Sequence, residues 1–360
     1  MRMKTFLPNV LALLMLFALE HTATAQSMNP PVRMPDASPK EVITHEIGIT
    51  DVTISYHSPD VKGRKVWGGL VPYDRVWRAG ANENTTISFA NDVKINGKPL
   101  AAGMYGLHVL PSEKEWVLIF SKNTTSWGSF SYDQKEDVLR VNITPQEIPV
   151  AYERLKYEFN KPTDSTTEAS LCWEKMKGAF TIETNTKENT LAMLRNEFLR
   201  SPHKFDWMGH WFAANYAYTN NINLEEALVW INRSLAAGNY FVNARLKADI
   251  LTKLGRTEEA KQAMDFAIRI GNPFDLSNYA NFLLRDKKPA EALVIAKKLE
   301  SNFSDLPAVT STLARTYSAN GNYPEALKYA KMSLEKVPEA NKAVWQTAIK
   351  KLEEGKDMNQ

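Results

Sequence analysis

The spacing of apolar residues along the chain changes near residue 185. From about Ser38 to Thr184 apolar and polar residues alternate in short runs, which is the pattern of half-buried β-strands. The run from Trp116 to Phe120 is apolar throughout and predicts a central strand covered on both faces. The clearest alternating runs are Val52–Tyr56, Thr86–Phe89, Tyr105–Val109, Leu139–Ile143 and Leu155–Phe159. Many short strands without a long helical stretch predict an antiparallel, β-sandwich-like domain over residues 38–184.

Two glycine-containing pairs predict tight turns inside this domain. Asn96-Gly97 follows the short apolar run Val93–Ile95, and both residues of the pair tolerate the positive φ angles of a two-residue hairpin. Lys177-Gly178 lies between two further apolar runs and predicts a similar turn. The domain is therefore expected to be built from hairpins.

Beyond Lys187 the apolar period becomes 3.6, and a repeat appears. The strings LEEAL, TEEAK, PAEAL and YPEAL place alanines at positions 227, 260, 292 and 326, at intervals of 33, 32 and 34 residues. Small residues recur twelve positions before and seven positions after most of these alanines, as two closely crossing helices require. Gly255 and Gly321 fall in the turns between helices, and Pro338 ends the last unit. The array resembles tetratricopeptide repeats, which are helix–turn–helix units of about 34 residues.

The repeats set the boundaries of the C-terminal half. We expect a linking helix over residues 185–204, the repeats over residues 205–338, and a capping helix and tail over residues 339–360. Asn215, Leu299 and the missing turn glycines of the first and third units depart from the pattern, so those units are expected to pack less regularly. The predicted fold class is an α+β multidomain chain, with the β-sandwich-like domain preceding an α-solenoid.

The N-terminus has the features of an export signal. Arg2 and Lys4 precede an apolar core from Phe6 to Leu19, and Ala23-Thr24-Ala25 supplies the small-x-small pattern of a cleavage site. This core is shorter than the roughly 20 residues of a spanning helix. We expect a signal peptide over residues 1–25, cleavage after Ala25, a flexible leader over residues 26–37, and an exported, periplasmic protein. No second apolar run of spanning length follows, so no transmembrane segment is expected in the mature chain.

Composition and motif content exclude several classes of function. Lys and Arg total 44 against 41 Asp and Glu, and a net charge of +3 spread along the chain argues against a nucleic-acid partner. The single cysteine, Cys172, excludes a disulfide framework and any multi-cysteine metal site. The chain also lacks a GxSxG elbow, an HExxH zinc helix, a Walker loop and a GxGxxG turn after a strand. The sequence therefore gives no indication of a cofactor, a metal site or a catalytic activity.

Two stretches of the β domain are too unusual for ordinary strands and turns. The first is GRKVWGGLVPYDRVWRAGANENTTISF at residues 63–89. The second is INGKPLAAGMYGLHVLP at residues 95–111, followed by WVLIFSKNTTSWGSFSYDQKEDVLRV, which ends at Val141. Together they resemble the bacterial family called domain of unknown function 2911, over about residues 38–182. The resemblance implies an exported β-rich domain, often joined to tetratricopeptide repeats, and it assigns no activity and no catalytic residue.

The segment WRAGANE is dense in groups that make directed hydrogen bonds, and it yields the candidate residues Trp77, Arg78, Asn82 and Glu83. A buried Arg78 needs a carboxylate or several carbonyls, and Glu83 is the nearest candidate. In one interpretation these polar residues lock a long loop over the end of the sandwich. In the other they form a pocket, in which Arg78 binds an anionic or carbonyl oxygen while Asn82 and Glu83 orient the ligand.

His57 and His108 are the titratable candidates for acid–base work in the β domain. His108 projects away from the face of Tyr105, Leu107 and Val109. A hypothetical metal or general-base site would combine both histidines with Glu83. The alternative is that each histidine is a lone side chain with satisfied hydrogen bonds.

Two functions follow from these patterns. The first is a non-catalytic binding or scaffolding protein of the cell envelope, whose repeats engage a protein partner. The alternative is a periplasmic enzyme or small-ligand receptor, with a polar pocket in the β domain around Arg78, Asn82, Glu83 and His108, to which His57 and Trp77 contribute.

Overall fold

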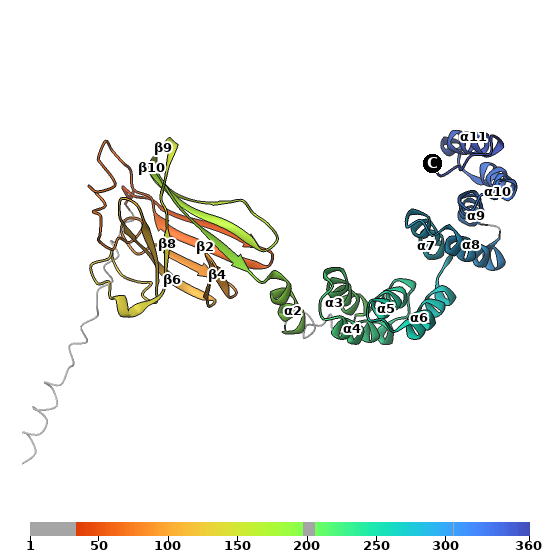
Figure 1. Ribbon diagram of the computed structural model, residues 1–360, viewed down its shortest axis with the longest axis horizontal. Helices are drawn as coiled ribbons and strands as arrows, with labels where there is room; N and C mark the ends of the chain where they lie inside the picture. The colour runs from red at the N-terminus through yellow and green to blue at the C-terminus, as the bar shows by residue number, and fades with distance from the viewer. Residues whose placement is uncertain (1–33, 197–205, 305) are drawn as a thin grey trace, which may run out of the picture.

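The computed structural model describes residues 34–196, 206–304 and 306–360. Within these ranges ten strands form an N-terminal β domain, and ten helices follow it (Figure 1). The predicted α+β class is therefore confirmed. The predicted signal peptide lies outside the described residues. None of the helices in the described part of the chain is both long and apolar enough to span a bilayer.

The β domain contains two antiparallel sheets. The larger has the strand order β1-β2-β3-β6-β7-β8, and the smaller has the order β5-β4-β10-β9. The strands are β1 Lys40–Ile47, β2 Thr50–His57, β3 Thr86–Phe89, β4 Val93–Ile95, β5 Lys98–Leu100, β6 Gly103–Pro111, β7 Trp116–Ser121, β8 Asp137–Ile143, β9 Gln146–Asn160 and β10 Thr166–Thr184. The apolar strand β7 lies inside the larger sheet, as predicted. Asn96-Gly97 makes the predicted β4–β5 hairpin, with both residues at positive φ.

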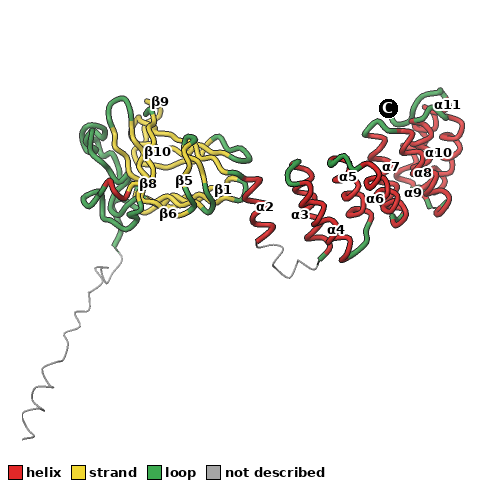
Figure 2. Tube along the Cα trace, turned by 60° about the horizontal axis from the view of Figure 1, so that its bottom comes forward, coloured by secondary structure: helices red, strands yellow, loops and turns green. Residues whose placement is uncertain are grey.

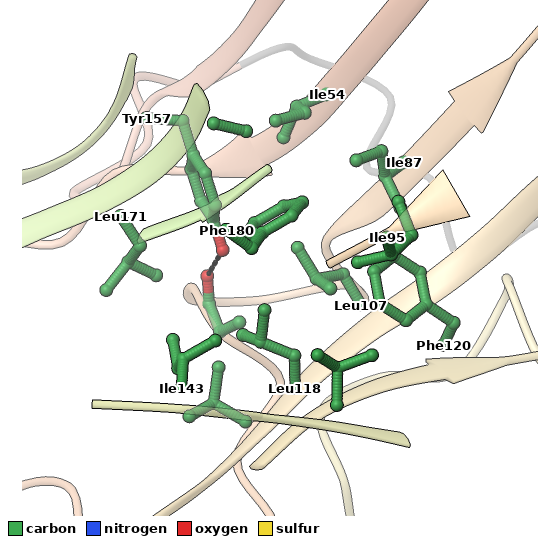
Figure 3. Packing of buried hydrophobic residues seen from close by; sticks show 14 of the residues in the cluster. Ile54, Ile87, Ile95, Leu107, Leu118, Phe120, Ile143, Tyr157, Leu171 and Phe180 are labelled. Carbon is green, nitrogen blue, oxygen red and sulfur yellow. Dashed lines mark hydrogen bonds between the residues drawn. The ribbon is translucent and has the colours of Figure 1, made fainter. Parts of the chain in front are cut away.

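The apolar faces of the two sheets meet in one core. Figure 3 shows side chains of both sheets in this core, among them Ile54, Ile87, Leu107 and Phe120 from the larger and Ile95, Tyr157, Leu171 and Phe180 from the smaller. Tryptophan rings extend the core: the ring of Trp67 lies 4.3 Å from that of Trp116, and Trp77 stacks 5.8 Å from Trp173. The alternation of apolar residues along the sequence is thus the alternation of core and outer faces.

The turn predicted at Lys177-Gly178 is wrong. Both residues lie inside β10, where Lys177 pairs with Gln146 of β9. The ring of Trp116 covers Gly178 so closely that a Cβ atom there would lie 2.6 Å from ring carbons. Glycine is needed at this position for close packing rather than for a turn, and a partner 62 positions away leaves no trace in the local pattern.

The helices form pairs along the C-terminal half (Figure 2). They are α2 Thr186–Asn196, α3 Trp207–Asn220, α4 Leu224–Ala237, α5 Phe241–Lys253, α6 Thr257–Ile270, α7 Pro273–Arg285, α8 Pro289–Phe303, α9 Pro307–Ala319, α10 Tyr323–Lys336 and α11 Glu339–Glu353. The alanines of the repeat are all buried between helices. They confirm the predicted helix–turn–helix units, and α11 packs against α10 in the place of the predicted capping helix.

The units without turn glycines still contain a left-handed residue in the turn. Lys287 takes the position of Gly255 and Gly321, five residues before the repeat alanine, and Asn221 lies six residues before it; all four have positive φ, between 53° and 75°. Asparagine adopts this left-handed region readily, whereas lysine loses about 1 kcal/mol there. The third unit therefore keeps the geometry of the turn at a cost in energy, whereas the first unit has a second residue at positive φ, Asn223, directly before α4.

Helix α2 connects the two halves. It begins two residues after β10 ends, and Asn189 Nδ2 donates to Thr184 Oγ1 at 2.8 Å and to Thr50 Oγ1 at 3.2 Å. On its other side Leu191 and Leu194 belong to the apolar cluster of α3 to α6. The same helix is therefore hydrogen-bonded to the β domain and packed into the repeats.

We expect Gly178→Ala to lower the free energy of unfolding of the β domain by about 1–3 kcal/mol, because the buried ring of Trp116 has no space to yield. Urea denaturation followed by tryptophan fluorescence measures the change. In a Trp116→Phe background the same substitution should cost less. Equal costs in the two backgrounds would show that the ring contact is not the cause.

Candidate functional site

The loop of residues 72–85 is fixed by a short antiparallel pairing with β6. The N–H of Trp77 donates to the carbonyl of Val109 and the N–H of Val109 donates to the carbonyl of Trp77, both at 2.8 Å. Trp77 and Val109 pack into the core. Successive side chains of an extended chain point to opposite sides, so Arg78 and His108 lie beside each other on the face away from the core.

The carbonyl of Ala79 anchors this loop from inside the domain. It accepts hydrogen bonds from Tyr157 Oη at 2.9 Å, drawn as the dashed line in Figure 3, and from Thr85 Oγ1 at 3.1 Å. Ala79 is buried and has a φ of 54°, in the left-handed region that alanine seldom adopts. The two buried donors hold the strained residue in place, so they also set the direction in which the following residues leave the core.

His57, Asn82 and Glu83 meet in one cluster with Asp36, which precedes β1. His57 Nε2 lies 2.8 Å from Glu83 Oε2, and Nδ1 lies 2.8 Å from the carbonyl oxygen of Ser38. Asn82 Nδ2 donates to Asp36 Oδ2 at 2.8 Å. The backbone N–H of Ser38 lowers the pKa of Asp36, with smaller contributions from Asn82 and His57. These contacts join the segment before β1 to the loop, as expected if the polar residues hold the loop in place. The cluster is here called the loop lock.

His108 lies in a second, separate environment. It is 2% exposed, its Nδ1 lies 3.0 Å from Ser129 Oγ, and its ring is edge-on to Tyr132. Asp137 Oδ2 accepts hydrogen bonds from Tyr132 Oη at 2.6 Å and from Arg140 Nη1 at 2.8 Å. Burial lowers the pKa of His108 to about 4, and the charge of Asp137 opposes that shift. His108 is therefore neutral at pH 7.

Arg78 is half-buried and forms no hydrogen bond or ion pair with the residues that the structure describes. The prediction that Glu83 is its partner is wrong, because Glu83 binds His57 instead. Burial alone lowers the pKa of Arg78. The guanidinium lies against Gly128, where a Cβ atom would be 2.7 Å from Nη1, and Gly128 has a φ of 74°. The chain therefore makes room for Arg78 without neutralising it.

Residues 126–133, here called the covering loop, lie over Arg78 and His108. The N–H of Asn84 donates to the carbonyl of Ser126 at 2.9 Å, and the N–H of Gly128 donates to the carbonyl of Asn82 at 3.1 Å. The loop supplies Ser129, which was not among the candidates from the sequence. Its string SWGSFSYD is rich in serine and aromatic residues, but no local pattern shows which strand it covers.

The six candidate residues thus occupy three environments. His57, Asn82 and Glu83 form the loop lock. Arg78 and His108 lie under the covering loop. Trp77 packs in the tryptophan core and donates its indole N–H to the carbonyl of Gly80 at 3.1 Å. The proposed combination of His57, His108 and Glu83 is not assembled, and the described residues contain no cluster of three or more His, Cys, Asp or Glu suited to a metal ion.

A hollow of about 1040 Å³ lies elsewhere, where the end of the β domain meets α2 and α3. Both of its lysines already have partners. Lys94 Nζ lies 3.1 Å from Glu183 Oε1, and Lys187 Nζ donates to the carbonyl of Asn220 at 3.3 Å. The hollow therefore has no unpaired lysine that would select an anionic ligand.

The repeats present a second group of incompletely paired polar atoms. Arg245 of α5 lies over the rings of Tyr279 and Phe282 of α7, at 5.2 and 4.7 Å from their centroids. Its Nε is buried without a hydrogen bond, although Asp249 Oδ2 is 3.4 Å away. Ser277 Oγ is also buried and unpaired within the described residues. Burial raises the pKa of Asp249, and Arg245 opposes that shift.

These features define a chain in which a two-sheet β domain precedes an α-solenoid of tetratricopeptide-like helix pairs. Residues 38–182 match the model of the family described as "Protein of unknown function (DUF2911)", and these residues form a domain of that family. No curated protein matches the chain.

Among solved structures, the chain is similar to the one titled "Crystal structure of YrrB: a TPR protein with an unusual peptide-binding site". The match has 18% identity and a TM-score of 0.28, and it covers 47% of this chain and 85% of that chain. The repeat fold of this chain is defined by its own helix pairs and not by this similarity.

We expect the stability of the β domain to fall at acidic pH because of His108. The pKa of His108 is about 4 when folded and 6.5 in its ordinary state. Its contribution is therefore fully present above pH 6.5, decreases as the pH falls, and is lost below about pH 4. The total is about 3 kcal/mol.

His108→Asn removes the titrating group and keeps a hydrogen-bonding atom near Ser129. Urea denaturation at pH 7 and pH 4 should give a smaller loss of stability for the variant than for the unmodified protein. If both proteins lose the same free energy of unfolding between these pH values, the assignment to His108 is wrong.

Proposed function

We propose that the chain is an exported binding or scaffolding protein of the cell envelope, whose repeats hold an extended segment of a protein partner. The basis for export is the N-terminal segment, with its basic start, apolar core and Ala23-Thr24-Ala25 site. The basis for partner binding is the face formed by the first helices of successive units, on which polar and aromatic groups remain incompletely paired.

This face can be followed from one unit to the next. Figure 1 shows the array as an arc, with α3, α5 and α7 along its inner side. Phe212, Arg245, Ser277 and Ser311 occupy the same position in the four units, at the 33-, 32- and 34-residue intervals of the repeat. A row of equivalent positions on stacked units suits an extended ligand, because successive residues of such a ligand meet successive units.

Arg245 is the observation that carries the proposal. Two hydrophobic clusters meet around it. Phe241 and Ala244 belong to the cluster that extends from α5 to α11, and Leu246 belongs to the cluster that extends from α2 to α6. Its terminal nitrogens make no hydrogen bond with a described residue. A guanidinium stacked on rings and open at its tip is a frequent anchor for carbonyl or carboxylate oxygens.

Exposed apolar side chains surround this position. Phe282 is 38% exposed, Phe274 is 73% exposed, and Val242 takes the same place in its unit as Phe274 in the next. Aromatic and arginine side chains together dominate the energetics of protein interfaces. The partner segment that fits has an apolar side chain to cover the rings, next to a backbone carbonyl or an acidic side chain for Arg245.

The test selects peptides from a displayed random library on the purified mature chain and measures their affinity by fluorescence anisotropy. We expect Arg245→Ala and Phe282→Ala each to weaken a selected peptide at least about tenfold, since both remove anchoring contacts. Phe130→Ala, which removes a more exposed ring from the β domain, is the control and should leave the affinity unchanged. Peptides that bind all three variants alike would contradict the proposal.

Export is tested independently of binding. The mature protein recovered from the periplasmic fraction should begin at Gln26, as read by mass spectrometry of its N-terminal peptide. An unprocessed chain in the cytoplasmic fraction would refute the localisation and leave the peptide experiment to decide the binding role.

A further inference from the structure

Arg78 carries a half-buried positive charge that the described residues leave without a partner. Its Nε is buried with no hydrogen bond, and burial lowers its pKa with no opposing carboxylate. Taking a guanidinium out of water without a carboxylate or carbonyl partner costs free energy. Nothing in the loop lock offsets this cost, because Glu83 is engaged by His57. A group from outside the chain would complete the environment of Arg78.

The surroundings determine the charge of that group. His108, beside Arg78, is neutral at pH 7. The carboxylate of Asp137 is bound by Arg140 at 2.8 Å and by the hydroxyl of Tyr132, so its charge is already compensated. The net charge at this place is therefore that of Arg78. This positive charge favours an anionic ligand.

The covering loop supplies polar and apolar contacts at the same place. Gly128 touches Arg78, and the next residue, Ser129, has its hydroxyl 3.0 Å from His108 Nδ1. When that ring nitrogen carries the proton, His108 donates to Ser129, and the hydroxyl hydrogen is free for a ligand. Trp127 and Phe130, on either side, are 61% and 89% exposed. They offer ring faces to a planar or apolar group.

We infer that Arg78, Ser129 and the exposed rings of Trp127 and Phe130 form a binding site for a small organic oxyanion, a carboxylate or phosphate attached to a planar apolar group. The terminal nitrogens of Arg78 bind the oxyanion in a fork, and the hydroxyl of Ser129 donates to it. This site differs from the six-residue pocket considered from the sequence, since it excludes the loop lock and includes the covering loop.

The pair His108–Ser129 invites comparison with a catalytic base and nucleophile. A general base works best when its pKa is near the working pH. His108, with a pKa of about 4, is too weakly basic at neutral pH to activate a hydroxyl. Its role in this site is to hold Ser129.

The experiment uses the full mature chain with benzoate, phenyl phosphate and neutral benzamide as probes. Binding is measured by saturation-transfer difference NMR and by quenching of tryptophan fluorescence. We expect at least one of the two anions to bind with a Kd of about 1 mM, and benzamide to bind at least about tenfold more weakly. Whether benzoate or phenyl phosphate binds more tightly identifies the oxyanion.

Arg78→Gln should abolish anion binding, and Phe130→Ala should weaken it. Arg75→Gln, which removes an exposed arginine three residues earlier, is the matched control and should have no effect. Because Arg78 has no partner to lose, Arg78→Gln should retain the melting temperature of the unmodified protein. If that variant does not fold, Arg78→Lys, which keeps the charge but loses the fork, should bind at least about tenfold more weakly.

Two results would overturn the inference. One is the absence of saturable binding of both anions up to about 20 mM, far above the expected Kd. The other is equal binding to the unmodified protein and to the folded Arg78 variant. Neither result bears on the repeats, because the anchoring residues tested in the peptide experiment belong to α5 and α7.

Discussion

Two hydrogen bonds to the carbonyl of Ala79 hold the part of the β domain on which its polar groups depend. Tyr157 reaches this carbonyl from β9 and Thr85 from the end of the loop, and both bonds are buried. They keep Ala79 in a left-handed conformation, at which the chain changes direction. Trp77 therefore stays in the core while Arg78 faces the covering loop. Without this anchor the guanidinium would turn into water and lose the surroundings that make it selective.

The sequence predicted most of the fold because most of the fold is local in origin. Repeat intervals and buried alanines depend on residues within one unit, so they placed the helix pairs correctly. Alternation likewise placed strands in both sheets, although it gave no run for β1. The turn at Gly178 failed because the reason for that glycine is the ring of Trp116, from a strand of the other sheet. A glycine required by distant packing looks the same in sequence as a glycine required by a turn.

The candidate site was less predictable because it also depends on contacts between residues far apart in the sequence. WRAGANE was rightly singled out as polar, but proximity in sequence suggested Glu83 as the partner of Arg78. The left-handed backbone at Ala79 and Asn82 turns these side chains to different places, so Glu83 reaches His57. Ser129 enters from a loop about fifty residues away. Periodicity shows which side of a strand a residue faces, and His108 was placed correctly by it, yet it does not show what covers that side.

Within the described residues, each half of the chain thus keeps one half-buried arginine that is not fully neutralised. Arg78 lies under the covering loop, and Arg245 lies on the rings of Tyr279 and Phe282. Other half-buried arginines of the described ranges are paired, as where Arg195 of α2 binds both carboxylate oxygens of Glu226 in α4. That pair ties the connecting helix to the first repeat, and a fork of this kind is the stable form for arginine. The two incomplete arginines are therefore the positions where an external oxygen ligand has most to contribute, one in each half of the protein.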